Sequence, residues 1–314
     1  MANRGWRQDP CRWRLKGRPA GTVYDETTHA RPRRQRARSR GTVTYCLGIV
    51  TDDGLVMASD SRSNAGFDQV NVCRKMYRFV IEDERVFVIL TSGSLSISQS
   101  VISLLRVDFD AGLGLAKAPS IYHAARIVGE TVRKVSEMDR ASLERDNFSF
   151  NVNLLLGGQV RGEPPTLYLI YPQGNPLQAT EDSPYLQLGE VKYGRPILDR
   201  GIQSATSLEV AAKYALLSFD ATMRSNVTVG PPIDLLLYKR DSFRITRYRR
   251  LGASDPDLNL IHESWEKSLR RAVEQLPEIE FDGPPATQTD TSTDSESARP
   301  ASIGEDQPQA AVRR

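Results

Sequence analysis

Two short apolar segments joined by a tight turn constrain the fold of this 314-residue chain more than any other feature. The segments are 44–50 and 54–60, and Asp52-Asp53-Gly54 forms the turn between them. A turn of this composition between apolar runs is a strong signal for a β-hairpin. We therefore expect the folded part of the chain to begin with two antiparallel strands.

The order of the remaining segments indicates the fold class. Further strands are predicted at 75–81, 86–90, 148–156, 166–171, 176–180, 233–238 and 243–248. Apolar residues at helical spacing predict helices around 97–105, 121–135, 208–219 and 257–275. Strands and helices come in batches instead of alternating singly, which favours an α+β fold over a doubly wound α/β fold. Hairpin-rich sheets with helices packed outside suggest a four-layer αββα sandwich.

The two ends of the chain differ in composition from the segment 44–281. Residues 1–43 contain twelve Lys and Arg and three acidic residues, so their net charge is +9. The net charge of the whole chain is +3, and the remaining residues therefore have a net charge of −6. This head has few apolar residues, and from 282 to 314 Pro, Thr, Ser, Asp and Gln dominate. Both ends are predicted to be disordered. A nucleic-acid arm is one interpretation of the head, but we expect no nucleic-acid partner, because the acidic remainder lacks a groove-reading motif.

Several classes of enzyme lack their residues in this sequence. The three histidines are His29 in the head and His123 and His262 on predicted helices, so a histidine-dependent nucleophile has no evident base. Neither paired metal ligands nor a phosphate-binding glycine loop occurs. We therefore expect no metal and no other cofactor. Three irregularly spaced cysteines fit a reducing cytoplasm, and no apolar run approaches the length of a membrane span.

Three residues near the predicted strand ends remain as candidates for chemistry. Thr44 begins the first strand, Asp60 ends the second, and Lys75 enters the third. Considered one at a time, Thr44 is explained as a β-forming residue, Asp60 as a turn residue and Lys75 as a solvated charge. Together they suit hydrolysis by an N-terminal threonine, in which the hydroxyl attacks a carbonyl and the residue's own α-amine accepts the proton. That chemistry requires a chain that begins at Thr44.

The sequence resembles the bacterial proteasome-type proteases, and within them the ancestral β-subunit group called Anbu. The resemblance spans about 44–281. It rests on the run from Thr44 to Gly66, Arg74-Lys75-Met76, Leu156-Gly157-Gly158-Gln159, 162–165, Leu188-Gly189-Glu190, 192–199, Met223-Arg224-Ser225-Asn226 and 230–236. It implies the sandwich fold of N-terminal-nucleophile hydrolases, in agreement with the order of segments.

The resemblance also implies the roles of the candidate residues. Thr44 is expected to be the nucleophile and, through its α-amine of intrinsic pKa about 7.7–8.0, the general base. Lys75 is expected beside the Thr44 hydroxyl, where its charge lowers the pKa of nearby groups, with Asp60 paired to it. The Gly93 N–H is expected to face the oxyanion.

Two supporting residues and the partners follow from the same resemblance. Ser225 and Asn226 stand where the family has a supporting polar pair near the amine, although the usual Asp and Ser are missing. The family works as a self-compartmentalised homo-oligomer on peptide or protein substrates, in a closed ring or an open spiral, here in the bacterial cytoplasm. Nothing in the chain identifies an ATPase partner.

The residues before Thr44 depart from the family pattern. Val43 precedes Thr44, whereas proteins of the family commonly start at Met-Thr. We hypothesise that Val43 marks a GUG start codon and that residues 1–42 are a gene-model error. If the head stays attached, Thr44 has an amide in place of an amine, and the alternative is a catalytically silent structural or binding subunit of a proteasome-like assembly.

Overall fold

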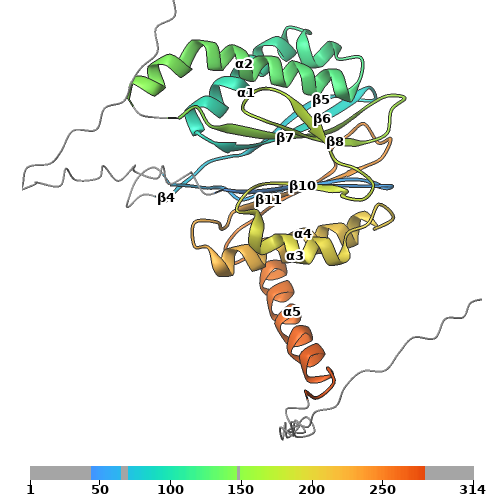
Figure 1. Cartoon of the computed structure of the whole chain (residues 1–314). Helices are drawn as coiled ribbons and strands as arrows, with labels where there is room; N and C mark the ends of the chain where they lie inside the picture. Colours follow the sequence, from blue (N-terminus) through green and yellow to red (C-terminus); the bar gives the residue numbers. More distant parts are fainter. Residues whose placement is uncertain (1–43, 65–69, 147–148, 280–314) are drawn as a thin grey trace, which may run out of the picture. The chain divides into compact units, whose positions relative to one another are not determined.

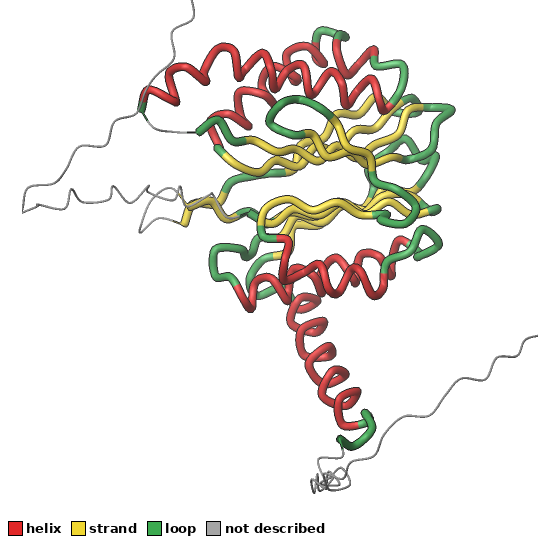
Figure 2. Tube along the Cα trace, in the orientation of Figure 1, coloured by secondary structure: helices red, strands yellow, loops and turns green. Residues whose placement is uncertain are grey.

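The computed structural model describes residues 44–64, 70–146 and 149–279, which belong to one compact unit. These residues form two stacked five-stranded antiparallel sheets with helices on both outer faces (Figures 1 and 2). The predicted α+β fold with four αββα layers is confirmed. The predicted disordered segments 1–43 and 282–314 lie outside the described residues, so the domain boundaries stay a prediction.

The first sheet contains the hairpin from which the sequence argument began. Its strands occur in the order β10-β1-β2-β11-β12. Their bounds are β1 (Tyr45–Thr51), β2 (Gly54–Ser59), β10 (Tyr185–Gly189), β11 (Ile233–Lys239) and β12 (Arg247–Leu251). β1 and β2 pair with Cys46 opposite Ser59 and Thr51 opposite Gly54. The start of β1 and the end of β2 therefore lie side by side at one end of the sheet.

The second sheet is antiparallel, and its strands are neighbours in chain order, β5-β6-β7-β8-β9. Its strands are β5 (Met76–Ile81), β6 (Arg85–Gly93), β7 (Val152–Val160), β8 (Thr166–Ile170) and β9 (Pro176–Gln178). The predicted pairings of β5 with β6 and of β8 with β9 are confirmed. A separate ribbon pairs β3 (Arg62–Asn64) with β4 (Val70–Val72) between β2 and β5.

Two pairs of helices form the outer layers. Helices α1 (Leu95–Asp110) and α2 (Ile121–Arg145), joined through the 3₁₀ turn η1 (Gly114–Lys117), pack on the second sheet. Helices α3 (Val191–Gly201) and α4 (Leu208–Ser225) pack on the first, and α5 (Pro256–Glu274) extends from that layer (Figure 1). Within the described part of the chain, every helix is too short or too polar to cross a membrane.

The two sheets approach closely because small residues face large ones between them. Met57 of β2 and Leu167 of β8 are fully buried in the cluster between the sheets. A Cβ atom on Gly48 would lie 2.6 Å from a Leu167 methyl carbon, and one on Gly157 would lie 2.8 Å from the Met57 sulfur. This tight packing holds the first sheet at a fixed distance from Lys75 at the start of β5.

Several elements differ from the sequence-based expectations. The short strands β3 and β4 and the turn η1 were not predicted, and β7 spans Val152–Val160 where a strand was predicted at 148–156. β10 and α3 were not predicted, since β10 mixes polar and apolar residues and Pro196 and Gly194 interrupt the helical pattern of α3. The predicted strand at 243–248 is wrong at its start. Phe243 has φ +46, so the chain is still turning there, and β12 begins only at Arg247.

Candidate active site

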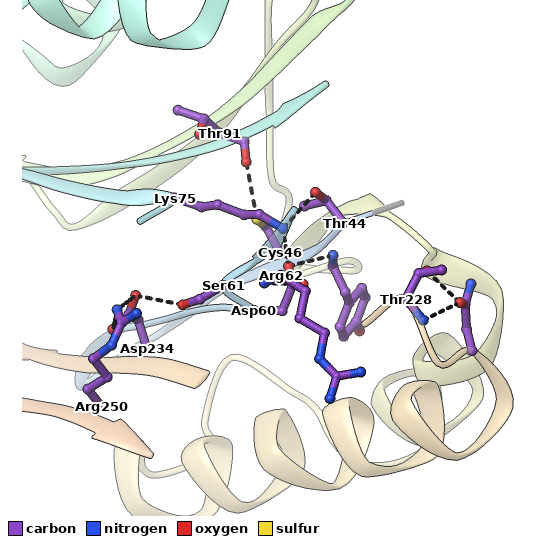
Figure 3. Close-up of polar contacts among 12 residues, drawn as sticks. Thr44, Cys46, Asp60, Ser61, Arg62, Lys75, Thr91, Thr228, Asp234 and Arg250 are labelled. Atoms are coloured by element: carbon purple, nitrogen blue, oxygen red, sulfur yellow. Dashed lines mark hydrogen bonds and ion pairs between the residues drawn. The ribbon is translucent and has the colours of Figure 1, made fainter. Parts of the chain in front are cut away.

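Three elements bring Thr44, Asp60 and Lys75 together. Thr44 directly precedes β1, Asp60 directly follows β2, and Lys75 directly precedes β5 of the other sheet. All three are buried, with at most 5 % of their surface exposed. Figure 3 shows the Lys75 side chain reaching across from the second sheet to Thr44 and Asp60. The hairpin and the stacking of the sheets therefore position the group.

Lys75 is the centre of this group. Its Nζ donates a hydrogen bond to Thr44 Oγ1 at 2.8 Å and to Asp60 Oδ1 at 2.6 Å. A buried ammonium is costly without a counter-charge, and Asp60, which is fully buried, supplies it. Lys75 thus holds a positive charge against the Thr44 hydroxyl oxygen.

Backbone donors hold Asp60 in place. Its Oδ1 accepts from the Tyr45 N–H at 3.1 Å, and its Oδ2 accepts from the Arg62 N–H at 3.2 Å. Burial raises the pKa of Asp60 above its ordinary value, while the Lys75 charge and these hydrogen bonds act in the opposite direction. The carboxyl is therefore fixed on both sides, with one oxygen aimed at Lys75.

A small hollow opens beside the Thr44 hydroxyl. Its lining residues are Thr44, Cys73, Lys75, Thr91, Ser92, Gly93, Leu95 and Ser98, and its volume is about 10 Å³. That is room for about one water molecule. Gly93 ends β6 with φ +104, and a Cβ there would meet the Asn151 carbonyl oxygen at 2.4 Å. Only glycine fits at this position of the lining, and its role toward an oxyanion stays a prediction.

Two residues opposite Thr44 were not predicted as site residues. The Glu190 N–H donates to the Thr44 carbonyl at 2.8 Å. Gly189 has φ +82, and a Cβ there would lie 1.7 Å from the same carbonyl oxygen. The pair Gly189-Glu190 therefore fixes the main chain of Thr44. The motif Leu188-Gly189-Glu190 was recognised in the sequence, but its contact with the main chain of Thr44 follows only from the pairing of β10 with β1.

The structure separates the two predicted supporting residues. Ser225 is exposed at the end of α4. Asn226 donates from Nδ2 to Glu190 Oε2 at 2.9 Å and so reaches the site through Glu190. Across the described ranges, no hydrogen bond joins either residue to the side chain of Thr44, Asp60 or Lys75. Their proposed support of the amine stays untested.

The cysteine next to the nucleophile candidate is a packing residue. Cys46 is fully buried, and its thiol donates to the Thr91 carbonyl at 3.6 Å. Burial raises the pKa of the Cys46 thiol far above its ordinary range, which keeps it protonated and unreactive. Among residues 44–64, 70–146 and 149–279, no three His, Cys, Asp or Glu side chains gather as metal ligands would.

Comparison with known proteins identifies the family. The family model described as "Proteasome subunit" matches residues 40–236. The chain belongs to the proteasome subunit family. Among curated relatives, proteasome subunit beta 2 of Pyrobaculum aerophilum is 26 % identical over 200 residues, which cover 63 % of this chain and 90 % of the relative.

Solved structures place the chain in the Anbu group of this family. The helical assembly of the Anbu complex from Pseudomonas aeruginosa is 46 % identical with a TM-score of 0.72, over 76 % of this chain and 99 % of that one. Anbu, named as the ancestral β-subunit, from Yersinia bercovieri is 41 % identical with a TM-score of 0.72, over 76 % and 100 %. The resemblance inferred from the sequence motifs is confirmed.

Proposed function

We propose that this Anbu-type chain is a threonine peptidase or amidohydrolase whose nucleophile is the Thr44 hydroxyl. The contact that supports the proposal best is the hydrogen bond of 2.8 Å from Lys75 Nζ to Thr44 Oγ1. A hydroxyl that receives a hydrogen bond from a buried ammonium is stabilised as it develops negative charge. The pairing of Lys75 with Asp60 at 2.6 Å keeps that ammonium in place.

The proposed reaction has two steps. Thr44 Oγ1 attacks the carbonyl carbon of the substrate while its proton passes to the α-amine of the same residue. That amine then protonates the leaving nitrogen, and an ester on Thr44 remains. Water, activated by the neutral amine, hydrolyses the ester and restores the hydroxyl. The Gly93 N–H is proposed as a donor to the oxyanion formed in both steps.

The proposal requires an unblocked α-amine. An amide nitrogen at Thr44 cannot accept a proton at working pH, so the active form must begin at Thr44. We propose that this form works on peptide or protein substrates as a homo-oligomer in the bacterial cytoplasm. A related Anbu complex is described as a helical assembly. The small volume of the hollow beside Thr44, about 10 Å³, means that this hollow alone does not accommodate a substrate side chain.

Peptide turnover by purified protein tests the proposal. The protein, with Thr44 established as its first residue by intact mass, is incubated with a library of fluorogenic peptide amides. We expect Thr44→Ala to lower turnover on the order of 1,000-fold or more. Thr131→Ala, which changes a buried threonine on α2, should leave turnover unchanged. Equal turnover by wild type and Thr44→Ala, or none by either, would favour the catalytically silent subunit.

A further inference from the structure

A second pocket lies at the end of the sandwich opposite Thr44. Thr44 directly precedes β1, whereas Thr51 is the last residue of that strand, and seven steps along a strand span about 23 Å. The pocket, which we call the Thr51 pocket, has a volume of about 300 Å³. It is lined mainly by the end of β1, the start of β8 and the connection from β9 to β10. A volume of this size lies at the lower end of the range for small-molecule sites.

The apolar part of the lining is rigid and has no aromatic ring. Three prolines, Pro164, Pro165 and Pro184, line the pocket together with the buried Leu167. Among the lining residues in the described part of the chain, none is Phe, Tyr, Trp or His. The pocket therefore offers apolar contact to a small molecule but no surface on which a nucleobase would stack.

The charged part of the lining carries both signs. The cation is Arg240, in the turn after β11, and the two carboxylates are Asp52 and Glu181; all three are exposed. Arg240 Nη1 donates to the main-chain carbonyl of Asp52 at 3.2 Å, which holds the guanidinium at the pocket. The rest of its planar fork suits a carboxylate. One positive charge against two negative ones fits a ligand that has both a carboxylate and an ammonium group, and disfavours a phosphate ester.

A buried hydroxyl in the lining lacks a partner. Thr51 is 4 % exposed, and its Oγ1 forms no hydrogen bond with any described residue. Most buried hydroxyl groups of native proteins are hydrogen-bonded, because an unpaired one is unfavourable. Since Thr51 lines the pocket, a polar group of a bound molecule can supply the missing partner. The ligand should therefore bring a hydrogen-bonding group, such as a peptide group, into the pocket.

We propose that the Thr51 pocket binds a dipeptide with free ends. The α-carboxylate pairs with Arg240, and the α-ammonium faces Asp52 and Glu181. The peptide group hydrogen-bonds with Thr51 Oγ1, and small apolar side chains lie against the prolines. The volume of about 300 Å³ has room for roughly ten water molecules at about 30 Å³ each, and a dipeptide of small residues is of that size. This assignment goes beyond the proposed function and uses no step of it, so it applies equally to a catalytically silent subunit.

Titration calorimetry of the full chain tests which ends of the ligand are recognised. The probes are alanyl-alanine, its N-acetyl form, which lacks the ammonium, and its C-terminal amide, which lacks the carboxylate. Wild type should bind each blocked form at least tenfold more weakly than alanyl-alanine. Arg240→Gln should lose the discrimination against the amide, and Asp52→Asn/Glu181→Gln should lose that against the acetylated form. The controls are Arg244→Gln and Asp182→Asn, which change exposed neighbours outside the lining and should retain both.

Thr51→Val tests the buried hydroxyl. It should weaken the binding of alanyl-alanine about fivefold, while the ligand-free protein unfolds at the same or a higher temperature because no hydrogen bond is lost. Thermal unfolding also shows that the charge variants are folded. Thr44→Ala should bind alanyl-alanine as wild type does, which separates this pocket from the candidate active site and from its chemistry.

Three results would overturn the assignment. The first is the absence of binding at millimolar alanyl-alanine, and the second is an equal affinity for free alanine, which would mean that a peptide group is not recognised. The third is a set of affinities that Arg240→Gln leaves unchanged, which would place the dipeptide elsewhere on the protein.

Discussion

The candidate active site at the ends of the sheets and helix α5 differ in how their side chains are covered. Thr44, Asp60 and Lys75 are at most 5 % exposed, and a short hydrogen-bonded chain links their side chains. In α5 no residue is buried, and within the described part of the chain the apolar residues Leu269 and Val273 near its end are 49 % and 58 % exposed. The comparison shows that the polar group is enclosed by its own chain, whereas the end of α5 is exposed within the described part of the chain.

Removal of the Lys75 charge is the largest single disruption that the comparison predicts. Lys75→Met leaves the fully buried Asp60 carboxyl without its counter-charge, which costs about 3–5 kcal/mol of unfolding free energy. It also removes the donor to Thr44 Oγ1, so peptide turnover should fall to background. Urea unfolding and turnover assays measure the two effects.

Lys192→Met is the matched control. Lys192 pairs with Glu190 at 3.4 Å, but its side chain is 64 % exposed, and an exposed ion pair contributes less than about 1 kcal/mol. A Lys75→Met variant as stable and as active as this control would show that the buried pair does not organise the site.

Gly189 tests whether the main chain of Thr44 must be held in place. Gly189→Ala puts a methyl carbon 1.7 Å from the Thr44 carbonyl oxygen at φ +82, and we expect a loss of about 3 kcal/mol from strain and overpacking. Displacement of Thr44 by a fraction of an ångström should lower turnover about 100-fold.

Gly162→Ala provides the comparison for this variant. Gly162 also has a positive φ, +90, but nothing lies within 4 Å of its added Cβ. Only the backbone strain of about 1 kcal/mol is expected there, with turnover unchanged. Equal losses of stability at both positions would mean that the contact between residue 189 and Thr44 does not contribute to the loss.

The hairpin half of the site was predictable from the sequence, because local signals fix it. Asp52-Asp53-Gly54 sets the register of β1 on β2, and this register alone places Thr44 beside Asp60. Lys75 followed from its position before an apolar strand together with the family resemblance. Its contact with Thr44 joins residues 31 apart in sequence and depends on how closely the two sheets stack.

The other half of the site was not predictable from local patterns, because its contacts are distant in sequence, and Asn226 was predicted only through the family resemblance. Glu190 and Asn226 meet through α3 and α4, and neither has a local signal that relates it to Thr44. The sequence of β12 is polar because two of its arginines face solvent and the third, Arg250, forms an ion pair with the buried Asp234. Because Arg250 takes part in this ion pair, β12 lacks the alternation of polar and apolar residues by which a strand is predicted from sequence.

Tyr45 links the nucleophile candidate to the outer helix layer and gives a pH test. Its hydroxyl bonds with Ser218 Oγ and accepts from Gln187 Nε2, so Tyr45→Phe should cost about 1–3 kcal/mol at pH 7. Burial raises the pKa of Tyr45 to about 12.

The sign of the pH effect follows from that raised pKa. The tyrosine contributes stability that is fully present below pH 10 and is lost as the pH rises through about 12. Tyr45→Phe lacks this dependence. The stability difference between wild type and variant should therefore shrink between pH 10 and 12, while buried tyrosines common to both proteins cancel. A difference that stays constant over this range would contradict the assignment.

Truncation of the apolar residues Leu258 and Leu269 of α5 should change the free energy of unfolding by different amounts. These are the smallest effects of this series. Leu258 packs on the α4 cluster, and Leu258→Ala should cost about 1–2 kcal/mol. Leu269 is 49 % exposed, and at dilutions where the chain is monomeric Leu269→Ala should change stability by less than about 0.5 kcal/mol. A large loss at Leu269 in the monomer would mean that this part of the helix is already covered by its own chain.

The most direct test of the account is the location of the acyl group during turnover. Protein that begins at Thr44 is mixed with an activated peptide ester, quenched in acid and mapped by mass spectrometry. The account predicts one acyl group on the peptide that starts with Thr44, and none at this position in Thr44→Ala or Lys75→Met. Hydrolysis without acylation of Thr44, or equal acylation in all three proteins, would contradict it.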